Sequence, residues 1–185
     1  MRHLIASSVI LAALAGCAAQ RSALPVQSGV DLQRYAGTWH EQARLPNRFQ
    51  DDCAGEVQAD YGIRPDGAID VVNQCRTRDG ATKTAHGLAR LSRDADPPDP
   101  AKLQVRFAPA WTSWLPMVWG DYWILRLQDG YRHALVGTPD RKYLWVLSRD
   151  RRADRATVDA LLDHARSLGF DTDRVVRTAG SAPSD

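Results

Sequence analysis

Short segments rich in apolar and β-branched residues recur along this chain, and turn signals separate them. Arg64-Pro65-Asp66-Gly67 is one such signal, because proline fixes its own φ and glycine tolerates a positive φ. Asp79-Gly80 and Asp129-Gly130 are further tight-turn signals. The segments predict eight strands, at residues 38–45, 56–63, 68–76, 82–91, 102–107, 119–128, 131–137 and 142–149. Eight short strands with mostly short connections are typical of an all-β up-and-down barrel or of a sandwich.

One segment after the strands has the period of a helix. Its apolar residues fall on one face, at Val158, Leu161, Leu162, Ala165 and Leu168. Asp154 is suited to cap its start and Gly169 to end it. We expect this helix to lie outside the sheet, against the strand at 142–149, which is apolar on both faces. A short last strand at 174–177 and a disordered tail at 179–185 are expected to follow.

The first residues are typical of an export signal. Residues 4–15 are apolar apart from two serines, a run too short to cross a bilayer, which takes roughly 20 residues. A buried helix is the alternative interpretation. Leu14-Ala15-Gly16-Cys17 resembles the lipobox of bacterial lipoproteins. The resemblance implies a signal peptide at 1–16, then a lipidated Cys17 that begins a flexible tether through residue 30. Ala18 after the cysteine implies, by analogy with enteric lipoproteins, an outer-membrane anchor with the domain facing the periplasm.

The charge balance and the histidines argue against several functions. Lys and Arg number 24 and Asp and Glu number 22, a net charge of +2, and the basic residues are dispersed. We therefore expect no nucleic-acid partner. The histidines stand singly, without the spacing of metal ligands, and no Ser or Cys has a nucleophile signature. We expect no metal, no cofactor and no enzymatic activity.

Two cysteines remain once Cys17 is assigned to lipid. Cys53 and Cys75 lie on either side of the Pro-Asp-Gly turn, and alternation places both on one face of the hairpin. In an oxidising compartment they are expected to form a disulfide between the second and third strands. Two free buried thiols are the alternative.

Two motifs at the ends of the strand region carry a family resemblance. The first is GTWHEQARLP at residues 37–46, with Phe49, and the second is YLWVLSR at residues 143–149. Together they resemble the outer signatures of lipocalins, in the bacterial and apolipoprotein D-like branch. His40 stands where that branch usually has tyrosine, and the middle signature, at residues 128–131, is degenerate. The resemblance covers residues 31–177 and sets the barrel domain at 31–178.

The resemblance implies an eight-stranded antiparallel lipocalin barrel with one helix packed outside. Trp39, preceded by Gly37, is expected to close the barrel, with the Arg149 guanidinium across its indole. Alternation from Trp39 and the family pattern predict the residues that bind a ligand: Glu41, Ala43, Leu45, Phe49, Asn73, Trp123, Leu125, Ala134, Val136 and Trp145. Glu41 is expected either to pair with Asn73 or a tyrosine or to orient a ligand head group.

The leading functional hypothesis is binding of a small amphiphile, a fatty acid or a lysophospholipid, for storage or transport near the outer membrane. The alternatives are a lipocalin-fold enzyme and an envelope protein with a filled barrel that acts through its surface. The apolar loop at residues 109–117 is expected to be a ligand lid, a patch that rests on lipid, or a segment folded into the barrel mouth. The sequence leaves the oligomeric state open.

Overall fold

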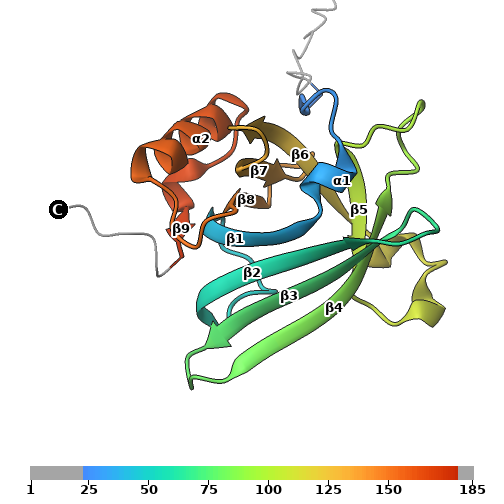
Figure 1. Cartoon of the computed structure of the whole chain (residues 1–185), viewed down its shortest axis with the longest axis horizontal. Helices are drawn as coiled ribbons and strands as arrows, with labels where there is room; N and C mark the ends of the chain where they lie inside the picture. The colour runs from blue at the N-terminus through green and yellow to red at the C-terminus, as the bar shows by residue number, and fades with distance from the viewer. Residues whose placement is uncertain (1–22, 179–185) are drawn as a thin grey trace, which may run out of the picture.

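Antiparallel strands close on themselves in the computed structural model of this protein, which describes residues 23–178 (Figure 1). The strands pair in the order β2-β3-β4-β5-β6-β7-β8-β1, and an additional β1–β2 pairing completes a barrel of eight. Their bounds are β1 Gly37–Arg44, β2 Cys53–Ile63, β3 Ile69–Thr77, β4 Thr82–Leu91, β5 Lys102–Arg106, β6 Gly120–Gln128, β7 His133–Gly137 and β8 Leu144–Ser148. The predicted fold class is confirmed, and the turn signals lie between strands as expected.

The predicted helix is α2 (Arg155–Ser167), and it lies outside the barrel beside β7 and β8 (Figure 1). The Asp154 carboxylate accepts a hydrogen bond from the Thr157 N–H and so caps the first turn. The apolar stripe of α2 is buried against the outward side chains of Leu135, Leu144 and Val146. This contact explains why the β8 strand is apolar on both faces.

The last strand is shorter than predicted. Residues Thr172–Arg174 form a 3-10 turn, and only Val176–Arg177 pair with β1, as strand β9. Thr178 ends the described chain, and its N–H donates to the Gln42 carbonyl.

A short helix, α1 (Leu32–Tyr35), precedes the first strand and has no counterpart in the predictions. The predicted flexible tether was extended to residue 30, which is too far toward the domain. Leu24 is only 5% exposed, and the Gln27 N–H donates to the Ile124 carbonyl at 2.9 Å. Residues 24–30 therefore pack on the barrel. The predicted signal peptide, Cys17 and the tail at 179–185 lie outside the described residues, and no helix within 23–178 is long and apolar enough to cross a membrane.

Two irregularities decide which side chains face the interior. Between Glu41 and Ala43 the β1–β8 register shifts by one residue, so Ala43 moves to the face that packs under α2. A second shift between Ile124 and Arg126 interrupts the alternation of β6. The expectation that Ala43 faces the interior is therefore wrong, since strict alternation does not survive a bulge.

The predicted orientation of β6 is also wrong. Ile124 pairs with Val136 and lies in the interior cluster with Trp39, whereas Leu125 is buried in the cluster beneath α2 and Trp123 packs against that cluster. Leu45, expected near the ligand, likewise lies in the α2 cluster. These side chains stabilise the layer between barrel and helix.

Candidate ligand-binding site

One end of the barrel is closed by the predicted tryptophan–arginine pair. The Arg149 guanidinium carbon lies 3.9 Å from the centroid of the Trp39 ring, and Trp39 is fully buried. The same guanidinium donates to the carbonyls of residues 34, 35, 36 and 38. Gly37 has a φ of +93°, and a Cβ there would lie 3.4 Å from Arg149 Nη1. The predicted roles of these three residues in closing the barrel agree with this geometry.

Just inside the closed end, three tyrosines converge. The Tyr35 and Tyr122 hydroxyls lie 2.7 Å apart, and the Tyr61 hydroxyl donates to Tyr122 at 2.9 Å. Burial raises the pKa of Tyr61 to about 12 and the pKa values of Tyr35 and Tyr122 well above their usual range. We name this set the tyrosine cluster. Sequence reasoning missed it, although Tyr61 shares the alternation of the predicted second strand.

The walls above this cluster are apolar. Ile69, Val71, Ala89 and Leu103 are buried together, with the Tyr61 and Tyr122 rings packed against them. On the other side of the barrel Ala134, Val136 and Leu147 line the same interior, and Trp145 packs against them. The predicted inward orientation of Ala134, Val136 and Trp145 is thus confirmed, whereas their contact with a ligand stays a prediction.

Toward the opposite end, side chains on the same face become accessible. Asn73 pairs with Ala59 on β2 and Ala85 on β4, and all three are partly exposed. Val71, one step nearer the closed end on the same face, is buried. Exposure does not change steadily along this face, since Tyr61 and Tyr122 near the closed end are partly exposed whereas Cys75, beyond Asn73, is buried. We call the end of the barrel opposite Trp39 and Arg149 the mouth.

Asn73 Oδ1 is buried, and no hydrogen-bond partner for it is present among residues 23–178. A buried polar atom without a partner is costly and rare in native proteins. A ligand hydrogen bond or a water molecule is the ordinary way to satisfy it.

A polar network borders the mouth around Glu41. The carboxylate accepts from Arg44 Nη1 at 2.8 Å, from Gln50 Nε2 at 2.6 Å and from the Thr178 hydroxyl. Gln50 Oε1 in turn accepts from the Trp145 indole. The Glu41 side chain is 2% exposed. Structural pairing of Glu41 is therefore confirmed, but the expected partners, Asn73 or a tyrosine, were wrong because the bulge brings Arg44 to the interior face.

The chain matches the family model described as a lipocalin-like domain over residues 30–180. It belongs to the lipocalin family. It is 37% identical to temperature-induced lipocalin-1 of Arabidopsis thaliana, over 88% of this chain and 86% of that protein. Outer membrane lipoprotein Blc of Escherichia coli (strain K12) is 34% identical, with 82% and 80% covered. Apolipoprotein D of Mus musculus is 30% identical, with 83% and 79% covered.

The solved structures agree on the fold of this lipocalin. Insecticyanin of the tobacco hornworm Manduca sexta superposes with a TM-score of 0.65 at 23% identity, over 86% of this chain and 85% of that one. Apocrustacyanin C2 gives a TM-score of 0.63 at 17% identity, over 82% and 81%. Family members are typically binding and transport proteins, consistent with an interior suited to small hydrophobic ligands.

The predicted disulfide is present in this lipocalin. Cys53 and Cys75 are bonded and join β2 to β3 close to the mouth. The alternative of two free thiols is excluded. The bridge fastens two strands whose register is irregular between Cys53 and Gln58.

The apolar loop between β5 and β6 extends into solvent. Trp111, Trp114 and Met117 are 76%, 75% and 85% exposed. The expectation that this loop folds into the mouth is wrong for these side chains. Phe49, a predicted ligand contact, is also exposed, and its ring lies 5.7 Å from the Tyr143 ring.

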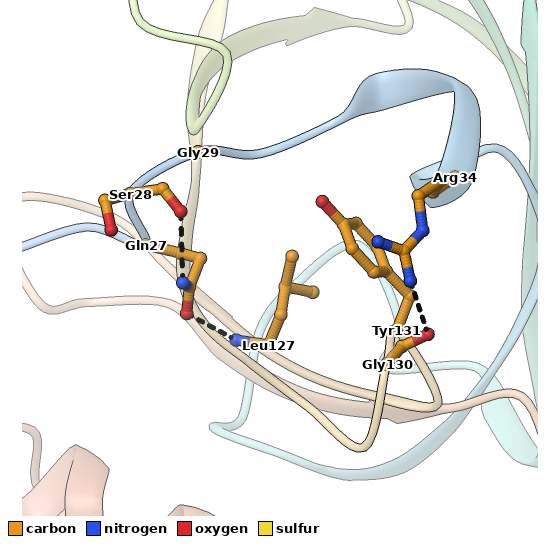
Figure 2. Close-up of a pocket in the computed structure, with 7 residues that line it drawn as sticks. All are labelled: Gln27, Ser28, Gly29, Arg34, Leu127, Gly130 and Tyr131. Atoms are coloured by element: carbon orange, nitrogen blue, oxygen red, sulfur yellow. Dashed lines mark hydrogen bonds between the residues drawn. The ribbon is translucent and has the colours of Figure 1, made fainter.

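Two surface pockets lie outside the barrel interior. One has a volume of about 210 Å³. It lies at the closed end, between Gln27, Arg34 on α1 and Tyr131 on the β6–β7 turn (Figure 2). The other, about 400 Å³, lies at the mouth rim. Its charged lining side chains are Arg48, Arg141, Lys142, Asp171 and Arg174. The rim beside the mouth is therefore basic.

Proposed function

We propose that this lipocalin binds a single-chain amphiphile, a fatty acid or a lysophospholipid, with its acyl chain in the barrel interior. The observation that carries the proposal is the unpartnered Asn73 Oδ1 on an otherwise apolar, partly solvent-open wall. Each methylene that leaves water contributes about 0.8 kcal/mol, so the walls supply affinity. A few polar groups would then orient the ligand.

The mouth has chemistry suited to a head group. Arg44 Nε is buried without a partner among the described residues, although Nη1 pairs with Glu41. The basic rim pocket lies next to Tyr143, which stacks on the inward Trp145. An anionic head group at the mouth would find these cations within reach and could contact Phe49. The Glu41 carboxylate would contact only a hydroxyl or cationic group of the ligand.

We further propose that Cys17 is lipidated and that the domain is anchored in the bacterial outer membrane, facing the periplasm. The support is the lipobox and the similarity to relatives that are named outer membrane lipoproteins. In cells fed labelled palmitate, the wild-type protein is expected to incorporate label and Cys17→Ala is not. Equal labelling of the two would contradict the anchor.

The exposed apolar loop supports a second contact with the same surface. Trp111, Trp114 and Met117 present apolar side chains with no cover among residues 23–178. We propose that the loop rests on lipid, which would hold the mouth beside its source of ligand.

Native mass spectrometry of the protein from Ala18 onward, produced in an oxidising compartment, tests the binding proposal. Titration with hexadecanoic acid and with a palmitoyl lysophospholipid, followed by tryptophan fluorescence, is expected to saturate at one equivalent. Asn73→Leu should weaken binding of the lysophospholipid about fivefold, the value of one hydrogen bond near 1 kcal/mol, because its glycerol hydroxyl can donate to Asn73 Oδ1. Gln74→Leu, on the opposite face of β3, is the matched control. A ligand-free mass and two flat titrations would reject the proposal and favour a filled barrel.

A further inference from the structure

The tyrosine cluster holds more hydrogen-bond donors than it uses. Each tyrosine hydroxyl carries one proton and accepts through its oxygen. Two hydrogen bonds join the three hydroxyls, Tyr61 to Tyr122 and Tyr35 with Tyr122. One O–H proton is therefore left over, on Tyr35 or on Tyr122 according to the direction of the bond between them. Within residues 23–178 the three hydroxyls make no other hydrogen bond.

The surroundings of the leftover proton are apolar. Tyr35 is packed against the rings of Trp39 and Tyr61, and Tyr122 against Leu103. Burial raises the pKa values of all three tyrosines, so the cluster remains a neutral donor at physiological pH. The Arg149 cation lies across the Trp39 ring and donates to backbone carbonyls, including that of Tyr35. Such a site suits an uncharged acceptor, since a full negative charge would be poorly compensated here.

We propose that the tyrosine cluster is a carbonyl-binding subsite at the floor of the barrel, and that ligands with a small uncharged carbonyl group at one end enter carbonyl first. The inference rests on the proposed function, because it requires an interior that admits ligands. The proposed subsite extends the range of ligands to ketones, aldehydes and protonated carboxylic acids that carry an apolar chain. A lysophospholipid, whose charged head group is too polar for this floor, would enter tail first.

A matched pair of ligands tests the subsite. Undecan-2-one and 2-methylundec-1-ene differ only in a C=O in place of a C=CH2, and their dissociation constants are measured by displacement of a fluorescent polyene fatty acid from the full chain. The preference for the ketone is the ratio of the dissociation constant of the alkene to that of the ketone. We expect this ratio to be about fivefold smaller in the triple variant Tyr35→Phe, Tyr61→Phe, Tyr122→Phe than in the wild type, which is the value of one hydrogen bond. Removing all three hydroxyls leaves no orphaned partner, so this variant is expected to fold.

Two controls separate a subsite from a structural effect. Tyr35→Phe alone should keep the preference, because Tyr122 then retains a free proton. Tyr131→Phe should also keep it, because that hydroxyl accepts from the Asp31 N–H outside the interior. Lysophospholipid affinity should be the same in the wild type and in the triple variant.

The outcomes distinguish the two proposals. If lysophospholipid displaces the probe but the ketone preference is equal in wild type and triple variant, the subsite is wrong and the proposed function stands. If neither the fatty-acid probe nor lysophospholipid binds, the proposed function fails first. The infrared C=O stretch of bound ¹³C-labelled ketone gives an independent reading. We expect a lower frequency in the wild type than in the triple variant, and identical frequencies would mean that water, not ligand, takes the proton.

Discussion

Replacing Arg149 should destabilise the barrel through its closed end. The guanidinium lies on Trp39 and donates to backbone carbonyls of the α1 segment, so one side chain fastens that segment to the barrel. The stacking contributes about 1 kcal/mol, at the lower part of its range because Arg149 is partly exposed. The bonds to Tyr35 O, Ala36 O and, from Nε, Tyr131 O are part-buried and contribute about 1 kcal/mol each, whereas water replaces the bonds to exposed carbonyls.

The expected loss for Arg149→Met is therefore about 4 kcal/mol in the free energy of unfolding. Urea denaturation followed by tryptophan fluorescence measures it, with the disulfide kept oxidised. Arg132→Met is the control, since the Arg132 side chain forms an exposed ion pair with Asp150, and such pairs contribute about 0–1 kcal/mol. Equal losses in the two variants would refute the assignment of a special role to Arg149.

Three further predictions concern other parts of the molecule. Replacing Cys53 and Cys75 by alanine opens a link between residues 22 apart and should cost about 3 kcal/mol of stability by chain entropy, measured by urea denaturation; an unchanged midpoint would contradict this. Tyr61 has a pKa raised to about 12, so its neutral hydroxyl stabilises the fold below pH 10 and this contribution disappears as the pH rises through 12. Between pH 8 and 12 the free energy of unfolding should thus fall less steeply with pH for Tyr61→Phe than for the wild type. Parallel curves of this free energy against pH would contradict the raised pKa of Tyr61. Trp111→Ser with Trp114→Ser should lower sedimentation with phospholipid vesicles by tenfold or more, since each buried indole contributes about 1.5–3 kcal/mol, and should leave unfolding unchanged. Equal sedimentation of the wild type and the double variant would show that the loop does not contact the membrane.

The strands and the outer helix could be predicted from sequence because their signals are local. Pro-Asp-Gly and Asp-Gly turns fix where a strand must end, and Asp154 with the stripe through Leu161 fixes the helix. The closure of the barrel by Trp39 and Arg149 came from motif resemblance, since the two residues are far apart in the chain.

The face that each side chain takes could not be predicted wherever a bulge intervenes. One extra residue near Gln42 sends Ala43 under α2 and Arg44 inside, and the only hint is the polar run around Glu41. The tyrosine cluster was missed for a different reason. It joins a short helix, β2 and β6, so no periodicity within one segment could reveal it.

The two halves of the barrel are packed differently. The strands β6, β7, β8 and β1 are packed on the inside by Trp39 and on the outside by α2, so they are buried on both faces. The strands β2, β3 and β4 form the other wall, away from α2, and their inward residues near the mouth, such as Asn73, are partly exposed (Figure 1). With only one packed face, these strands bury less apolar area and must be held otherwise. The Cys53–Cys75 bridge joins β2 to β3 in that half and so supplies a covalent restraint on the wall that α2 does not cover (Figure 1).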